Sequence, residues 1–309
     1  MKSIYSMATN KSNKSHMHLI NSDENILQVL EQSNRYLESN KDLSSRIRSL
    51  LSVFHSLEDL MPQTVEKFWS GHMFPIVEAN SELENSIMLC KLGFYKHAFI
   101  ALRSVLELGL LSVYWDIDGR SHVDIQKWLH SFENTQRKKT MYTKLKTNQN
   151  FRKFDDKHEI FNELDNIFKQ LSDFVHTKGR SHSNMDLGNS TCNRFNEKSL
   201  LKWSELVIKV AKSVIILHIL EYPVALQYTP IEQKFGINGP AGTFLEPYQV
   251  ERIRQFFDKD IVETLQDISD NDLEAKSLAQ WVSEQPDISE VEFQAQIEEF
   301  EKRHETLKE

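Results

Sequence analysis

Glycine, proline and cysteine are all scarce in this chain of 309 residues. It holds 9 glycines and 7 prolines, and a chain so poor in turn-forming residues cannot easily make many short strands joined by tight turns. The two cysteines, Cys90 and Cys192, are far apart and belong to no CxxC pair. This spacing excludes a disulfide framework and a cysteine-rich zinc site, and it favours a reducing compartment.

Catalytic and cofactor signatures are also absent from the sequence. No GxSxG, GxxxxGK[ST] or GxGxxG motif occurs, which argues against a nucleophile-elbow hydrolase, a P-loop protein and a dinucleotide-binding fold. The histidines lack an HExxH scaffold and a carboxylate at metal-ligand spacing. We therefore expect no cofactor and no metal site.

Long uncharged apolar runs are missing as well. The most apolar windows, 98–115 and 205–226, both contain charged side chains, and residues 1–20 have no apolar core of the kind found in signal peptides. A bilayer-spanning helix needs about 20 mostly apolar residues. We therefore expect no contact with a membrane and a cytoplasmic location.

Charge is distributed unevenly along the chain, whose net charge is −8. Residues 246–309 hold 18 acidic and 7 basic residues, whereas the preceding 245 residues carry a small positive net charge. An acidic tail thus follows a mildly basic body.

Apolar residues recur at helical spacing through most of the chain, and in residues 94–116 they surround the helix on all sides, as in a segment buried within a protein. The sequence predicts an all-α fold, a helical bundle with a central buried helix and an acidic helical C-terminal extension. We expect a disordered leader at 1–20, a helical core domain at 21–222, a linker rich in glycine and proline at 223–247, and an acidic helical region at 248–309.

The predicted central helix carries two charged residues that form the first part of a candidate site. Arg103 and Glu107 are four residues apart and so share one face of the helix. They form either a structural salt bridge or an anion clamp, in which the planar guanidinium holds a phosphate and the carboxylate orients it. His176 follows the apolar residues at the end of a later helix, where the helix dipole favours a protonated imidazole.

Two basic stretches are candidates for contact with nucleic acid. The first, 135–153, holds seven Lys/Arg and no acidic residue, and its cations are interleaved with Tyr142 and Phe151, aromatic residues of the kind that stack on RNA bases. An ordinary solvated loop or helix face is the alternative interpretation. The second stretch is the segment after His176. The candidate RNA-binding residues of the two stretches are Lys138, Lys139, Lys144, Lys146, Arg152, Lys178, Arg180 and His182.

The segments AFIALRSVLELGLL at 98–111 and LSDFVHTKG at 171–179 resemble helical proteins of the prokaryotic HEPN superfamily and their abortive-infection-like relatives. The resemblance covers residues 75–222. It implies an all-α bundle, often a homodimer, in a phage-defence or toxin–antitoxin setting. Active members resemble metal-independent RNases that use an Arg, four to six variable residues and a His, with Arg on the phosphate and His acting on the 2′-hydroxyl or the leaving group.

This chain departs from that pattern at His176, because Leu171, Gln170 and Lys169 stand where the Arg is expected. Arg48 with His55, and Arg152 with His158, do have the spacing, but the first pair lies outside 75–222 and we expect the second to straddle a helix start.

Three hypotheses about function follow from the sequence. The leading one is a HEPN-like protein of a phage-defence or toxin–antitoxin type system that binds RNA, a nucleotide or a protein partner such as an antitoxin, degenerate as a nuclease, with Arg103, Glu107 and His176 at its centre. The second is an active metal-independent endoribonuclease. The third is a non-enzymatic structural or regulatory interaction protein, whose acidic tail docks on its own basic body or on a partner.

Overall fold

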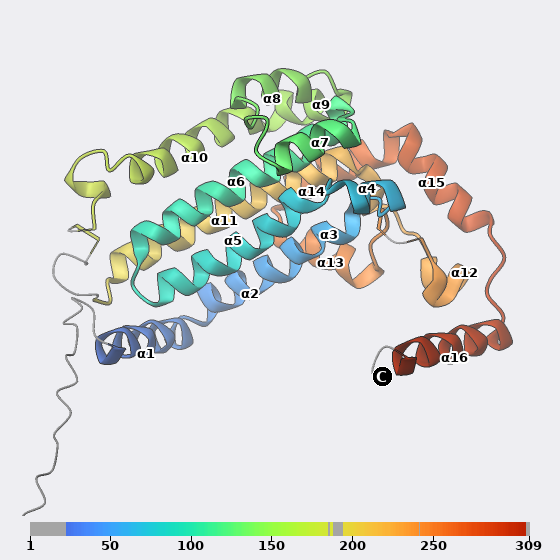
Figure 1. The fold of residues 1–309 in the computed structure, drawn as a ribbon, viewed down its shortest axis with the longest axis horizontal. Coiled ribbons are helices and arrows are strands. Elements are labelled where there is room, and N and C mark those ends of the chain that lie inside the picture. The colour runs from blue at the N-terminus through green and yellow to red at the C-terminus, as the bar shows by residue number, and fades with distance from the viewer. Residues whose placement is uncertain (1–22, 185, 188–193, 241, 307–309) are drawn as a thin grey trace, which may run out of the picture.

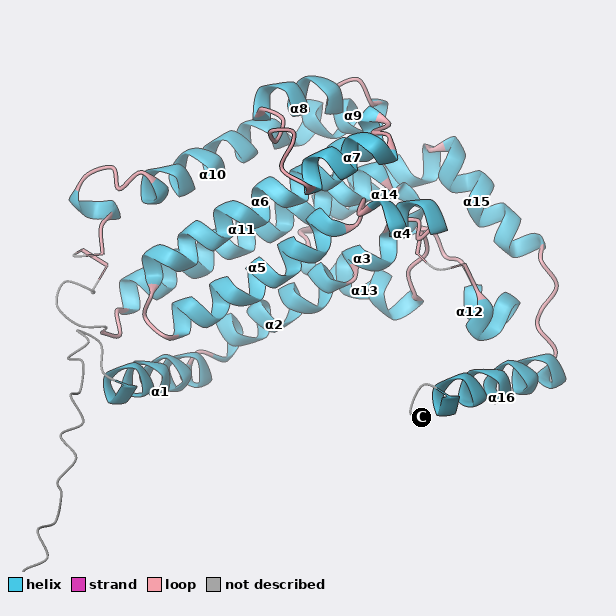
Figure 2. Cartoon of the chain, viewed as in Figure 1, coloured by secondary structure: helices cyan, strands magenta, loops and turns pink. Residues whose placement is uncertain are grey.

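The computed structural model describes residues 23–184, 186–187, 194–240 and 242–306. The leader expected at 1–20 lies outside these residues. The described residues form α-helices, three short 3-10 helices and the loops between them, with no strand among them (Figure 2). The prediction of an all-α bundle is therefore confirmed.

Long helices form the body of the molecule and run in roughly similar directions (Figure 1). Among them α6 is central, because it packs most extensively against three partners, α5, α10 and α11. These body helices are α2 (Lys41–His55), α5 (Phe74–Lys91), α6 (Tyr95–Asp118), α10 (Ile160–Val175) and α11 (Glu197–Glu221).

Burial on nearly every side makes α6 the core helix that its sequence predicts. Its residues from Ala98 to Val113 are mostly buried, and they pack against other aromatic and aliphatic side chains in one continuous core. Gly119 ends the helix in the left-handed conformation, φ +66°, a conformation that glycine adopts without strain. By length and hydropathy α6 also passes as a membrane span, but 72% of its most apolar window is buried inside the protein. That degree of burial is typical of a core helix.

Further helices lie around the body. On the N-terminal side are α1 (Asp23–Ser39) and the short helices α3 (Leu57–Leu60) and α4 (Val65–Ser70). Between α6 and α10 lie α7 (His122–Leu129), α8 (Lys138–Leu145) and α9 (Gln149–His158), and η1 (Arg180–His182) follows α10.

The basic stretch 135–153 is folded rather than looped, since α8 and α9 contain most of it. Phe151 is fully buried and Tyr142 is half-buried against Phe161. The interpretation of Phe151 as a base-stacking residue is therefore wrong. Its spacing from Phe154 (three residues) places both on one face of α9, and that face packs into the core.

The C-terminal region begins inside the core. Its elements are η2 (Pro223–Leu226), α12 (Ile231–Phe235), η3 (Gly236–Asn238), α13 (Pro247–Phe256), α14 (Lys259–Asn271), α15 (Leu273–Glu284) and α16 (Glu290–Thr306). All four residues of η2 are buried, although they begin the segment that the sequence suggests as a linker.

The helix α13 and the acidic helix α14 dock on the body, whereas α16 lies at its edge (Figure 1). Ile253 of α13 and Leu265 and Ile268 of α14 are buried in the common core. The helix α16 contacts the η3 segment, where the Gln296 side chain donates to Phe235 O and accepts from Ile237 N. Docking of α13 and α14 thus rests on apolar burial, with ion pairs around it.

Candidate functional site

The three residues predicted to form a centre line one cavity between α6 and α10. Its volume is about 290 Å³, and its lining side chains are Ile100, Arg103, Ser104, Glu107, Ser172, Val175 and His176. The first four come from α6 and the last three from the end of α10. The antiparallel-type contact of two helices brings together residues about seventy positions apart in the sequence.

Arg103 is held in place by neighbours on both helices. Its Nη1 donates to Phe168 O at 3.1 Å and to Ser172 Oγ at 2.5 Å, and its Nη2 donates to Glu107 Oε1 at 2.5 Å. The guanidinium carbon lies 4.5 Å from the centre of the Phe168 ring, a cation–π arrangement. The expected salt bridge with Glu107 is therefore present. The same contacts fix the guanidinium at the wall of the cavity.

Arg103 still has hydrogen-bonding capacity that the described residues leave unused. Its Nε is buried without a hydrogen-bond partner among them. A buried donor without a partner costs free energy, and a functional role is one of the reasons for which native proteins keep such a group. Because Glu107 is about half exposed, its pairing with Arg103 is of the solvent-screened kind that a competing anion can displace.

His176 caps the C-terminus of α10 in a strained turn. The Thr177 N–H donates to Phe174 O and the Lys178 N–H donates to Asp173 O, the two bonds of a Schellman motif. The residue in the left-handed position is Thr177, φ +49°, where a β-branched side chain is unusual. Lys96 of α6 donates to its hydroxyl at 2.6 Å. This bond ties the turn that contains the His176 backbone to α6, while the His176 side chain is exposed.

Four of the eight candidate RNA-binding residues lie near this cavity. Lys178, Arg180 and His182 follow directly after His176, and their side chains are exposed or half-exposed. Lys138, at the start of α8, lies 5.0 Å from the centre of the Phe168 ring, the ring that also carries Arg103. All but His182 have acidic neighbours within 4 Å among the described residues.

Of the other four, Lys144 and Lys146 lie toward the opposite end of α10, Arg152 lies on α9, and Lys139 follows Lys138 on α8. Lys146 sits 4.5 Å from the ring centre of Phe161, in the first turn of that helix, and Phe161 is about 22 Å along the helix from His176. Lys144 pairs with Asp118 and Lys146 with Asp155, each at 3.3 Å. Lys139 and Arg152 are exposed and make no ion pair with the part of the chain that the structure describes. The structure therefore does not bring the whole predicted set together at one place.

The two Arg/His pairs that have the spacing of the active HEPN RNases lie on two different helices, α9 and α2. Arg152 and His158 both lie within α9, so the expectation that they straddle a helix start is wrong. Six residues of α-helix nevertheless put their side chains about 120° apart. Arg48 and His55 are seven residues apart on α2 and share a face, where His55 lies 3.3 Å from Glu84.

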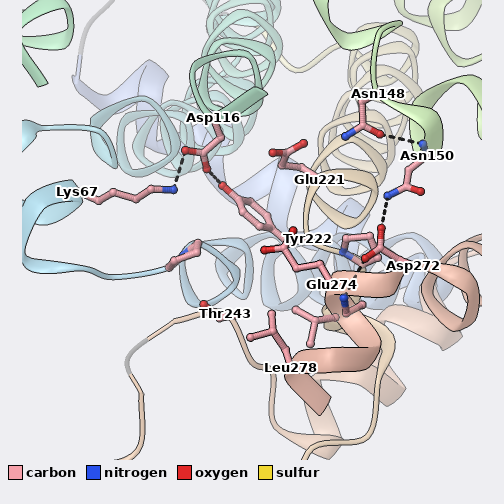
Figure 3. Close-up of a pocket in the computed structure, with 14 residues that line it drawn as sticks. Lys67, Asp116, Asn148, Asn150, Glu221, Tyr222, Thr243, Asp272, Glu274 and Leu278 are labelled. Carbon is pink, nitrogen blue, oxygen red and sulfur yellow. Dashed lines mark hydrogen bonds and ion pairs between the residues drawn. The ribbon is translucent and has the colours of Figure 1, made fainter. Parts of the chain in front are cut away.

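A second polar cluster, not anticipated from the sequence, lies where α6 and α11 end (Figure 3). The Asp116 carboxylate, whose side chain is 9% exposed, accepts from Lys67 Nζ at 2.7 Å and from the Tyr222 hydroxyl. His72 Nε2 lies 2.5 Å from the same carboxylate. Burial by itself would raise the pKa of Asp116, but His72 and Lys67 outweigh it and hold the pKa below its ordinary value.

Beside this cluster, Glu221 at the end of α11 has a buried Oε2 with no hydrogen-bond partner among the described residues. Burial, reinforced by Asp116, raises the pKa of Glu221 to about 8. The sequence does carry a signal for this cluster. Asp116 and Glu221 are charged residues at the ends of strongly apolar helices, the same kind of anomaly that marks Arg103 and Glu107. The sequence does not, however, indicate that the two helix ends lie close together.

Comparison with known protein families, with curated proteins and with solved structures finds no match to this chain.

Proposed function

We propose that this protein is a HEPN-like helical protein that binds RNA or a nucleotide between α6 and α10 without cleaving it. The observation that carries the proposal is the cavity lined by Arg103, Glu107 and His176. A phosphate entering it would meet a fixed guanidinium, an imidazole at a helix C-terminus and the cations that follow α10. Its volume of about 290 Å³ suits a phosphate or a nucleotide fragment and not a folded domain.

Binding is favoured over cleavage by the way Arg103 and His176 are held. Arg103 is engaged by Glu107, Phe168 and Ser172. His176 has no side-chain hydrogen-bond partner among the described residues, so nothing orients it as a general base. The spacing motif of the active HEPN RNases also does not end at His176. An active RNase is the alternative, and the same experiment distinguishes the two. For either activity we propose a phage-defence or toxin–antitoxin setting, as the resemblance implies.

We expect Arg103→Ala to weaken binding of a single-stranded RNA by about ten- to a hundredfold, since a charge-assisted hydrogen bond contributes about 1.5–3 kcal/mol. His176→Ala should weaken it less. Fluorescence anisotropy over a salt series measures both effects, and each lost phosphate contact should also reduce the salt dependence by about one ion. Arg35→Ala is the matched control, because Arg35 forms the same kind of i,i+4 pair with Glu31 on α1.

Equal RNA affinity of the wild type, Arg103→Ala and Arg35→Ala would exclude this site. RNA cleavage that His176→Ala abolishes, together with growth inhibition on expression that the same variant relieves, would favour the active ribonuclease instead.

A second candidate function is regulatory, and two ion pairs favour it. The acidic helix α14 covers part of α9, where Lys153 pairs with Asp267 and Lys157 with Asp260, each at 2.6 Å. The acidic tail thus occupies cations on the body that would otherwise face solvent. In this proposal it competes with an anionic partner for α9.

Replacing Asp260 and Asp267 by Asn should raise RNA affinity several-fold at low salt, because it frees Lys157 and Lys153 while the apolar packing of α14 remains. Truncation of the tail is a poorer test, since Ile253, Leu265 and Ile268 are buried in the core. The charge-matched control is Glu298→Gln with Glu301→Gln, two exposed residues of α16. An equal gain in the control would show a net-charge effect and reject competition at α9.

A further inference from the structure

A cavity of about 480 Å³ lies where the ends of α6 and α11 meet the start of α15 (Figure 3). This volume is in the range of small-molecule sites in proteins, about 300–1,000 Å³. Seven segments contribute to its walls, from the residues before α4 to α15. It is separate from the cavity of Arg103 and His176, and no residue lines both.

The cavity is electronegative. Its lining holds four carboxylates, those of Asp116, Glu221, Asp272 and Glu274, against the single ammonium group of Lys67. Three helices, α6, α11 and α14, end at or next to it, and two, α9 and α15, begin there. The partial charges of helix C-termini and N-termini have opposite signs, so the helix dipoles offset one another. The excess of carboxylates is the feature that favours a positively charged occupant.

Two of the four carboxylates are already engaged within the protein. Asp116 holds Lys67, His72 and Tyr222. Asp272 accepts from Asn150 Nδ2 and from the backbone N–H of Ala275, each at 2.9 Å. These contacts leave the carboxylates of Glu221 and Glu274 for another partner.

Glu221 is the group whose surroundings require such a partner. Its Oε2 is buried and accepts no hydrogen bond from the described residues, and an unsatisfied buried polar atom costs about 1–3 kcal/mol. Around it stand Asp116 on α6, Asp272 and Glu274 by α15, and Lys67 on α4, which is already bound to Asp116. Glu274 is exposed at the rim.

Within α11 itself, one turn before Glu221, His218 supplies no compensating charge. It is fully buried, and burial lowers the pKa of His218 to about 4, so the imidazole is neutral near pH 7. Because burial and the neighbouring carboxylates raise the pKa of Glu221 to about 8, the Glu221 side chain is mostly protonated at the same pH. A cation that enters would displace this proton.

We propose that this cavity binds a small organic cation with a primary ammonium or guanidinium group, with Glu221 as its main counter-charge and Glu274 at the entrance. Both groups offer several N–H donors, which suit an unsatisfied carboxylate oxygen. A metal ion fits less well, since the described residues contain no group of three or more His, Cys, Asp or Glu side chains arranged to hold one.

Agmatine and putrescine are suitable probes, because both remain cationic throughout the neutral range and fit the volume. In isothermal titration of the full chain, we expect affinity to rise about tenfold between pH 6 and pH 7 and to level off above about pH 8, as Glu221 loses its proton. About one proton should be released per ligand at pH 7. Titrations in two buffers of different ionisation enthalpy measure that release.

Glu221→Gln should lower the affinity for both probes at least tenfold and abolish proton release, while Glu205→Gln, an exposed residue of the same helix, should change neither. Leu278→Trp, which fills the cavity from α15 without altering charge, should also prevent binding. The proposal is overturned by pH-independent binding, by unchanged binding in Glu221→Gln, or by binding of inorganic phosphate at this cavity. The absence of heat with either probe at millimolar concentration and about pH 8.5 overturns it equally.

Discussion

Replacing Asp116 by alanine is expected to lower the free energy of unfolding by about 3–5 kcal/mol, the cost of removing one partner from a buried charge network. The carboxylate receives Lys67, His72 and Tyr222 from three different segments. His72 is 4% exposed, so water cannot replace the lost carboxylate. A typical domain is stable by about 5–15 kcal/mol, and this loss would be a large fraction of it. Urea unfolding followed by circular dichroism measures the effect.

The effect of Asp116→Ala should depend on pH in a defined direction. The pKa of Asp116 is below its ordinary value in the folded chain, so its stabilising contribution is complete at neutral pH and is lost as pH falls through the folded pKa. The difference between wild type and variant should therefore shrink at about pH 3. Asp156→Ala, at an exposed position of α9, should stay within about 0.5 kcal/mol of the wild type. A similar loss in both variants, or one that is constant with pH, would contradict the role of the network.

Gly109→Leu is expected to destabilise the protein by about 3 kcal/mol, the upper part of the range for overpacking a core. Gly109 lies in the middle of α6, and a Cβ atom there would stand 2.6 and 2.7 Å from the two methyl groups of Val214 on α11. Val214 is fully buried and has a single preferred rotamer in a helix, so it cannot move aside easily. Thermal or urea unfolding provides the measurement.

Helix propensity predicts the opposite sign for this substitution, because leucine is better than glycine in a helix interior by almost 1 kcal/mol. A stabilised Gly109→Leu variant would show that α6 and α11 are not in contact at this point. The double variant Gly109→Ala with Val214→Ala separates the two effects. Its two substitutions should couple favourably by about 1 kcal/mol or more, since each removes the clash or the cavity left by the other.

The helical class and the central position of α6 could be predicted because they depend on local sequence features. Scarcity of turn residues and apolar residues on all sides of one segment are properties of the chain itself. Charged residues within an otherwise apolar helix were informative as well. Arg103 and Glu107 in an apolar helix do form a salt bridge, and they share a cavity with His176 as the candidate site requires. Their role in binding RNA stays a prediction.

Composition was a weaker guide to the basic stretch. Its aromatic residues suggested stacking on bases, but Phe151 is fully buried, and several of its cations are paired with carboxylates from distant segments. Lys153, for example, pairs with Asp267, more than a hundred residues later. Charge counts cannot reveal such pairing. A lysine contributes the same charge to the count whether its side chain faces solvent, RNA or another part of its own chain.

The sequence by itself determined that this protein is helical, that residues 94–116 lie at its centre and that an acidic region follows a mildly basic body. Periodicity and composition suffice for these features because a helix is stabilised along its own length and by one apolar surface. Only the tertiary structure decided that Asp116 and Glu221 meet at the ends of α6 and α11, that Gly109 permits those two helices to approach, and that α14 covers α9. The physical reason is that such contacts join residues about a hundred positions apart, and the direction in which whole helices pack, not any local pattern, brings them together.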